Sequence, residues 1–179
     1  MMSSFSAQLD RRIGLRAVWS DHVESWTNTA GVARKAERRH WYLWFFGAPT
    51  LLSAPFAFFH LELQGIGQIL SGTAVFTGLL FGMLGVVFNM GVTLRKDGGQ
   101  FPNAHNLPQT ISDLRANITY AIVIGLLLSV ALVIASATSG TAGLPWLWTP
   151  LIVWLFIHLG QTLMMVLRRF RTAFNYITR

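Results

Sequence analysis

The sequence predicts an all-α integral membrane protein with four transmembrane helices and with both termini in the cytoplasm. Three observations lead to this class. The chain has 179 residues, of which 53% are hydrophobic and only 12% are charged, about half the charged fraction of an ordinary soluble domain. The apolar residues are gathered into long blocks, and the basic residues lie on one side of those blocks only.

The apolar residues form four blocks, and none of the blocks contains Asp, Glu, Lys or Arg. They cover residues 41–61, 66–94, 118–138 and 146–167. A helix needs about 20 predominantly apolar residues to cross the hydrocarbon core of a bilayer. A soluble core would need four uncharged runs of this length in a short chain, so the sequence favours four membrane spans.

The distribution of basic residues predicts the topology. All 14 Lys and Arg residues lie in segments 1–40, 95–117 and 168–179. Basic residues near span ends are retained in the cytoplasm, so these three segments are expected inside, and residues 62–65 and 139–145 outside. No cleavage site follows the first span, so no removable signal peptide is expected. We expect a multi-pass protein of the bacterial inner (plasma) membrane.

The first span is aromatic and contains two prolines, Pro49 and Pro55. Each proline removes one backbone donor, so this helix is expected to bend. Neighbouring helices are then expected to cover the carbonyl groups that lose their partners.

The second span carries small residues along one face, at Ala74, Gly78, Gly82 and Gly85. Small residues allow a second helix to approach closely. The partner is expected to be another span of the same chain or the same span of a second copy. The third span is expected to begin before the membrane, with residues 110–117 as a short cytoplasmic extension that starts at a capping box.

Polar side chains deep in the spans mark a candidate site. His158 and Gln161 share one face of the fourth span, and Asn89 of the second span lies at a depth close to that of Gln161. Polar groups in hydrocarbon usually face the protein interior or a water-filled path. One interpretation is a hydrogen bond between Asn89 and Gln161, with neutral His158 bonded to a serine or a backbone carbonyl. The other is a polar constriction in a pore.

The cytoplasmic segments are basic and partly amphipathic. Leu15, Trp19, Val23 and Trp26 form a helical stripe that could lie on the membrane or pack against a partner helix. The loop at 95–110 is rich in glycine, proline and amides, and the tail at 168–179 is expected to continue the fourth span as a helix.

Basic residues next to spans fix topology and bind anionic lipid. Positive charge interleaved with aromatic residues also suits a nucleotide or oligonucleotide. The candidate anion-binding residues are Arg34, Lys35, Arg38, Arg39, Arg95, Lys96, His105, Arg115, Arg168, Arg169 and Arg171.

Several kinds of chemistry have no support in the sequence. There is no buried carboxylate pair, no nucleophile motif and no metalloprotease motif. A haem between helices would need two histidines at matching depth, and His40, His60 and His158 lie at three different depths. We therefore expect a non-enzymatic protein with no cofactor and no metal site.

Two functional classes fit these observations. One is a homo-oligomeric channel-like or pore-forming effector that is controlled by an anionic ligand or partner protein in the cytoplasm. The other is an accessory subunit that binds a larger membrane complex through the small residues of the second span. With its four short spans, no outer domain and a basic inner face at residues 34–39, 95–96 and 168–171, the chain resembles the small four-span membrane effectors of bacterial anti-phage defence systems of the Hailong and Kiwa types. The resemblance implies an effector that responds to a cytoplasmic partner or nucleotide-type signal.

Overall fold

The computed structural model describes residues 14–26, 35–96, 107–139 and 146–177, and the elements within these ranges are helical. In chain order they are α2 (Leu15–Ser25), α3 (Lys35–Tyr42), the π-helical turn η1 (Leu43–Gly47), α4 (Ala48–Phe58), α5 (Ile66–Lys96), α6 (Leu107–Ser139) and α7 (Thr149–Ile177).

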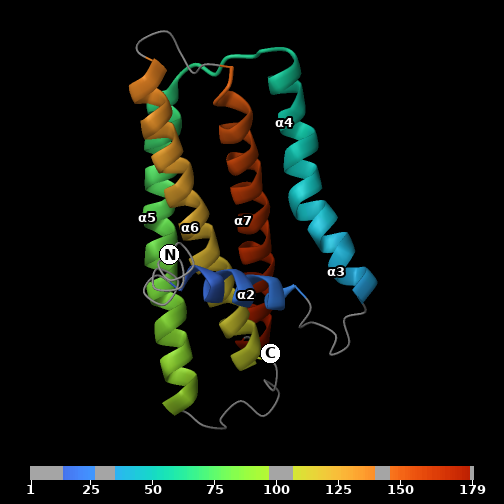
Figure 1. The fold of residues 1–179 in the computed structure, drawn as a ribbon. Helices are drawn as coiled ribbons and strands as arrows, with labels where there is room; N and C mark the ends of the chain where they lie inside the picture. Colours follow the sequence, from blue (N-terminus) through green and yellow to red (C-terminus); the bar gives the residue numbers. More distant parts are fainter. Residues whose placement is uncertain (1–13, 27–34, 97–106, 140–145, 178–179) are drawn as a thin grey trace, which may run out of the picture.

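The long helices pack side by side in a row. α5 packs against α6, α6 packs against α7, and α7 packs against α4 (Figure 1). The short helix α2 runs across this row and packs against α6. Because the described part of α4 packs on α7 and not on α5, the row stays open and does not close into a ring.

Within the described ranges, three helices are long and apolar enough to cross a membrane. Their candidate spans are Ile66–Leu94, Leu107–Thr138 and Thr149–Asn175. The first of these has the bounds predicted for the second span. α6 includes the predicted cytoplasmic extension at 110–117, and α7 continues through the predicted helical tail to Ile177. α7 begins at Thr149, three residues later than the sequence pattern indicated.

The first predicted span has a different local structure. Helical conformation runs without a break from α3 through η1 to α4, but the α-helix is interrupted by the π-helical turn at Leu43–Gly47. This segment ends at Phe58, so the predicted bound at residue 61 is wrong. α4 lies along α7 (Figure 1). Its crossing of the membrane, like the cytoplasmic position of both termini, stays a prediction.

The contact between α5 and α6 depends on one glycine. The α5 side chains that face α6 include Thr73, Thr77, Leu80 and Val87, all buried. A Cβ atom at Gly125 of α6 would lie 2.5 Å from Oγ1 of Thr77. The absence of a side chain at Gly125 therefore lets the two helices approach closely.

The small residues of α5 do not take part in this contact. Ala74, Gly78, Gly82 and Gly85 are exposed. A Cβ atom added at any of the three glycines would have no neighbour within 4 Å. A partner within the same chain, one of the two expectations for this stripe, is therefore not found among the described residues. We call these four residues the small-residue face of α5.

Helix α2 packs against the bundle with a face that only partly overlaps the apolar stripe, because Trp19 and Trp26 of the stripe contact bundle residues and the other stripe members are less buried than Trp26. The fully buried residues are His22 and Ser25, next to the nearly buried Trp26, whereas Leu15 is exposed. The bundle-facing side is thus rotated from the predicted stripe toward its polar neighbours. Of the two expectations for α2, the structure has the helix packed on a partner helix, α6.

Candidate functional site

His158 of α7 lies at the centre of a buried group of polar and aromatic side chains. Its ring is only 1% exposed. Nδ1 lies 3.1 Å from the carbonyl oxygen of Phe45, and Nε2 lies 2.8 Å from the hydroxyl of Tyr120. A carbonyl oxygen only accepts hydrogen bonds, so Nδ1 carries a proton, and in the neutral form of the ring Nε2 accepts the Tyr120 hydroxyl proton.

Local sequence explains why the Phe45 carbonyl is available. In an α-helix this oxygen would accept the N–H of residue 49, which is a proline and has none. The π-helical turn at Leu43–Gly47 ends two residues before that proline. His158 supplies the missing donor, which confirms the expectation that a neighbouring helix covers a carbonyl released by proline.

A second histidine reaches this site from the cytoplasmic helix. The ring of His22 in α2 stacks on Tyr120 with 3.9 Å between ring centroids and 13° between planes. Its Nδ1 lies 2.7 Å from Oδ1 of Asn117. We call His22, Asn117, Tyr120 and His158 the histidine cluster. The cluster connects α2, which lies outside the candidate spans, with the interior of α6 and α7.

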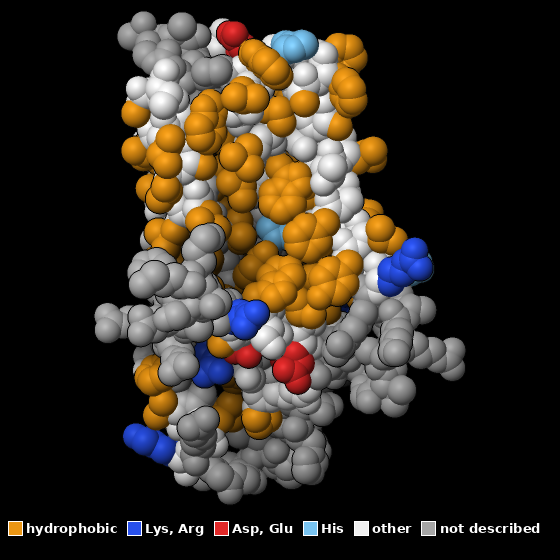
Figure 2. Space-filling view, viewed as in Figure 1, with side chains coloured by type: hydrophobic (Ala, Val, Ile, Leu, Met, Phe, Trp, Pro, Cys, Tyr) orange, Lys and Arg blue, Asp and Glu red, His pale blue; other side chains and the backbone are white. Residues whose placement is uncertain are grey.

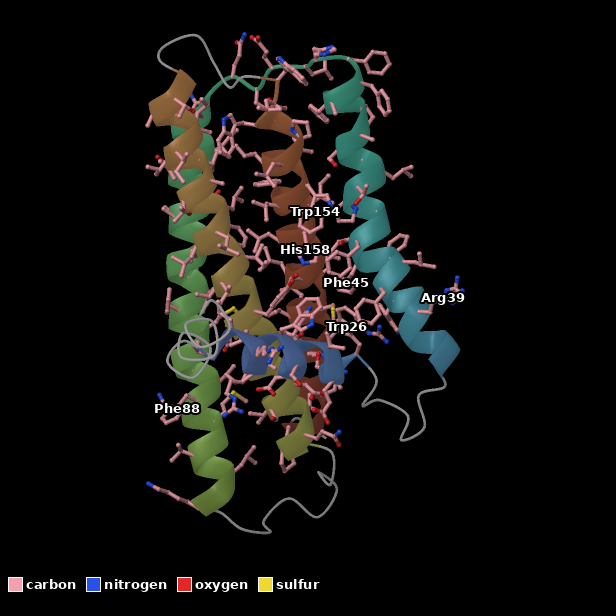
Figure 3. All side chains as sticks on the ribbon, viewed as in Figure 1. Trp26, Arg39, Phe45, Phe88, Trp154 and His158 are labelled. Atoms are coloured by element: carbon pink, nitrogen blue, oxygen red, sulfur yellow. The ribbon has the colours of Figure 1, made fainter. Side chains whose placement is uncertain are left out.

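Aromatic rings enclose the histidine cluster on several sides. Trp154 stacks on His158 at 5.0 Å, and Phe45 stacks on Trp26 at 4.9 Å. Trp19 contacts Tyr120 at 5.7 Å. Figure 3 shows Trp26, Phe45, Trp154 and His158 gathered between α2, η1 and α7. These rings exclude water, so each hydrogen bond within the cluster is electrostatically stronger than it would be at the surface.

One arginine holds α2, α6 and α7 together below the cluster. The guanidinium of Arg169 in α7 forms an ion pair with Asp113 of α6, and it also donates to the backbone carbonyl of Ser25 in α2. Ser25 in turn donates to the carbonyl oxygen of His22 at 2.6 Å. The end of α2 is therefore tied to both long helices.

The packing of α2 against α6, which we call docking, leaves some buried polar atoms without hydrogen-bond partners among the described residues. Nε2 of His22, Nε1 of Trp26 and Nδ2 of Asn117 are buried and have no hydrogen-bond partner among the residues that the structure describes. His22 and Asn117 meet between α2 and α6, and Trp26 lies at the end of α2 against Phe45 of η1. An unpaired polar atom in a protein interior loses its bonds to water and gains none in return, so each one opposes docking.

The environment of His22 favours its neutral form. The pKa of His22 is lowered from 6.5 to about 4, mainly by burial and also by the nearby His158 and Arg169, against the opposing effect of the Asn117 hydrogen bond. Docking of α2 therefore requires an uncharged His22.

The three polar residues predicted to lie deep in the spans, His158, Gln161 and Asn89, do not come together in one site. The amide nitrogen of Gln161 lies 3.4 Å from the carbonyl oxygen of Trp44, and its Oε1 has no partner. Asn89 lies exposed on α5. The hydrogen bond considered between Asn89 and Gln161 is absent, because α5 packs on α6 and Gln161 faces η1. The hydrogen bond from His158 to a backbone carbonyl, part of the same interpretation, is present.

The candidate anion-binding residues differ in their availability. Arg39, Lys96, Arg115, Arg168 and Arg171 are exposed. Arg169 is already paired with Asp113. Arg34 and His105 lie outside the described residues, as do the side chains of Lys35, Arg38 and Arg95. In Figure 2 the visible Lys and Arg side chains lie in the lower part of the molecule, below a broad hydrophobic surface.

Sequence reasoning missed His22, Asn117 and Tyr120 as members of the site. The comparison of histidine depths omitted His22, whose helix lies outside the apolar blocks. Tyr120 separates the two histidines, with ring centroids 3.9 Å from His22 and 5.8 Å from His158. The pair therefore does not face a shared metal position, and within the described ranges no group of three or more His, Asp and Glu residues could hold a metal ion.

Comparisons of the chain with protein-family models, with curated proteins and with solved structures found no match. The geometry of the histidine cluster and of the small-residue face of α5 is therefore the basis for a functional proposal.

Proposed function

We propose that this protein is a non-enzymatic, channel-like membrane effector that acts as a homo-oligomer and is controlled from the cytoplasm through α2. One observation carries the proposal. A helix outside the candidate spans inserts His22 among the long helices and is linked through Tyr120 to His158 in α7. A change in the position of α2 therefore alters hydrogen bonds inside the bundle.

The energetics of docking support a movable α2. Burial of Trp26 and the stacking of His22 favour the docked position. Three unpaired polar atoms oppose it, each by about 1–3 kcal/mol. These penalties reduce the net free energy that holds α2 in place, so a ligand or partner that binds α2 or its surroundings needs to supply less free energy to shift the helix.

The exposed basic residues suit an anionic signal. Arg39, Arg168 and Arg171 are exposed, and the last two share α7 with Arg169, which holds the end of α2. A nucleotide, an oligonucleotide or an acidic protein segment bound there would compete for Arg169 and weaken its bond to Ser25. The resemblance to anti-phage effectors favours a signal of this kind.

Assembly of several copies is part of the proposal because the described helices of one chain enclose no conduit. They form an open row, and the small-residue face of α5 has no neighbour among the described residues. Asn89 is exposed on the same side of α5 and has no hydrogen-bond partner among the described residues. A second copy of α5 would cover the small residues closely and could pair the two amides.

Cysteine cross-linking tests the assembly, since the natural chain has no cysteine. Ala74→Cys and Asn89→Cys should each form disulfide-linked dimers in reconstituted vesicles after mild oxidation. Met164→Cys is the matched control, because Met164 is exposed on α7. Equal cross-linking at all three positions, or none at positions 74 and 89, would contradict contact through α5.

Ion flux from reconstituted vesicles tests the control by α2. Arg169→Gln removes the tie to Ser25 and should change the flux severalfold relative to the natural protein. Arg168→Gln removes a neighbouring exposed charge without touching the bond to Ser25, so it should leave the flux unchanged when no nucleotide or oligonucleotide is present. Release of α2 without any change in flux would refute the regulatory role of this helix.

The alternative function is an accessory subunit of a larger membrane complex. The small-residue face of α5 favours it as well, because a different protein could cover the same surface. An absence of flux with and without nucleotides, together with failure of the α5 cross-links, would favour this alternative.

The topology that both functions need is tested by reporter fusions. Reporters at residue 98 and after residue 179 should lie in the cytoplasm, and reporters near residues 63 and 142 should lie outside. A cytoplasmic reporter at residue 63 would remove the proposed crossing by α3, η1 and α4.

A further inference from the structure

A pocket lies between the C-terminal turns of α5 and the N-terminal turns of α6, apart from the histidine cluster. Its volume is about 350 Å³, within the range of ligand pockets in proteins. The lining residues are Val87, Phe88, Gly91, Val92 and Leu94 of α5, and Pro108, Ile111, Ser112 and Arg115 of α6.

One position on the wall of the pocket, Gly91, has no side chain. A Cβ atom at Gly91 would lie 3.8 Å from Cγ2 of Ile111, which is ordinary contact distance. A small side chain would therefore fit without strain, whereas a longer one would extend into the hollow. The surrounding Val87 and Phe88 make this part of the pocket apolar.

The pocket also carries one positive charge. Arg115 is exposed, and its guanidinium forms no ion pair with another described residue. Arg169 of α7, by contrast, is engaged by Asp113, which lies two residues before Arg115 on α6. The hydroxyl of Ser112 lies on the same wall as Arg115 and can donate a further hydrogen bond.

The position of the pocket restricts its ligand. The apolar candidate span of α5 ends at Leu94, which lines the pocket, and Lys96 follows two residues later. The pocket thus lies where an apolar stretch of the protein meets its basic end. A soluble phosphate or nucleotide would leave the apolar wall without contacts, and a neutral lipid would leave Arg115 without a partner.

We propose that this pocket binds one anionic phospholipid, with an acyl chain against Val87, Gly91 and Ile111 and with the phosphate at Arg115 and Ser112. The assignment is independent of the channel and accessory functions. It predicts selective retention of anionic lipid by the purified protein. An arginine at a membrane surface contributes enough to anionic lipid binding to change affinity about fivefold.

Native mass spectrometry of the full chain in detergent, with phosphatidylglycerol and phosphatidylcholine added in equal amounts, tests the proposal. The natural protein should retain phosphatidylglycerol preferentially, and Arg115→Gln should reduce that retention about fivefold. Arg171→Gln is the matched control, since it removes an exposed arginine of α7, and it should retain the lipid as the natural protein does. Gly91→Leu should reduce the retention of both lipids by filling the apolar part.

Three results would overturn the proposal. They are equal retention by Arg115→Gln and Arg171→Gln, no preference for the anionic lipid, and complete displacement of phosphatidylglycerol by soluble glycerol phosphate. The last result would mean that the headgroup alone is recognised. Arg115 is exposed, so its replacement should leave the fold intact, and the decision does not depend on how well Gly91→Leu folds.

Discussion

α5 and α6 are adjacent helices of 31 and 33 residues with similar apolar composition, yet they use their surfaces differently. In the most apolar part of α6, 50% of the residues are buried inside the chain, whereas in α5 the share is 17%. α6 contacts α2, α5 and α7 and contributes Asn117 and Tyr120 to the histidine cluster. α5 contacts α6 and leaves its small-residue face uncovered.

This difference indicates two roles: α6 stabilises the fold of the single chain, and the outer side of α5 is available for association between chains. Changes around α6 should break hydrogen bonds and packing that the folded chain already has. Changes on the outer side of α5 should leave the single chain folded and should weaken the binding of the second copy or partner protein that covers that side. The following predictions test this division, from the largest expected effect to the smallest.

The largest effect is expected for His158→Ala. The change leaves the Phe45 carbonyl and the Tyr120 hydroxyl buried without partners and opens a cavity between aromatic rings. The free energy of unfolding should fall by about 3–5 kcal/mol. Denaturant unfolding in mixed micelles measures it. Phe88→Ala, on the exposed side of α5, should change the free energy of unfolding by no more than about 0.5 kcal/mol. An equal loss of stability in both variants would contradict the different roles of α6 and of the outer side of α5.

Acid should release α2 from the bundle. His22 is neutral when docked, with a pKa of about 4, and titrates near its ordinary 6.5 when exposed. Docking is therefore at full strength above pH 6.5 and weakens as the pH falls toward 4, by up to about 3 kcal/mol. A fluorophore on Ala17→Cys would report the release.

His22→Gln is the control for the acid response, because glutamine does not titrate. Tyr120, His158 and Arg169 also lie near His22, and they are unchanged in this variant. The fluorescence change between pH 6.5 and 4 should disappear. An unchanged acid response would assign the release to another group.

Asp113→Asn should loosen α2 by a smaller amount. The change removes the charge that orients Arg169 toward the Ser25 carbonyl, and a charge-assisted hydrogen bond contributes about 2 kcal/mol. The same fluorophore on α2 should show partial release at neutral pH. Asp21→Asn, an exposed acid on α2 itself, should not change the signal, and release in both variants would point to general charge effects.

The smallest effect compares two glycines. Gly125→Ala should reduce stability by about 1 kcal/mol, since the new methyl group meets Thr77. Addition of Thr77→Ala should restore most of the loss by removing the obstructing side chain. Gly82→Ala should leave the single chain as stable as before or slightly more so, because alanine favours helix.

The effects of the two glycine substitutions on association between copies should have the opposite order to their effects on stability. Gly82→Ala lies on the small-residue face of α5 and should weaken association between copies, measured by native mass spectrometry in detergent. Gly125→Ala should leave association unchanged. A loss of association in Gly125→Ala alone would move the interface away from the outer side of α5.

The elements that could be predicted are those set by composition over many residues. The apolar run at 66–94 has the bounds of the candidate span in α5, because a long uncharged segment has few alternatives to a single helix. The predictions for the start of α7 and for the end of α4 were less accurate. Trp146–Trp148 has an apolar composition but forms a turn, and the chain leaves the helix at Phe59 where no charge or glycine marks the end.

The histidine cluster was only partly predictable, and His22 shows why. In the sequence it is one polar residue beside an apolar stripe in a segment of mixed composition. Its role depends on the rotation of α2 about its own axis and on the position of Tyr120, which is 98 residues further along the chain. No local pattern encodes either of these.

The sequence by itself determined the helical class, the long apolar helices and the release of the Phe45 carbonyl by Pro49, since each depends on residues close together in the chain. Only the tertiary structure decided that His158 satisfies that carbonyl, that Tyr120 joins the two histidines, and that the small residues of α5 face outward. The physical reason is that hydrophobicity fixes how long a helix is, whereas the partner of each face depends on packing among helices that are distant in the sequence.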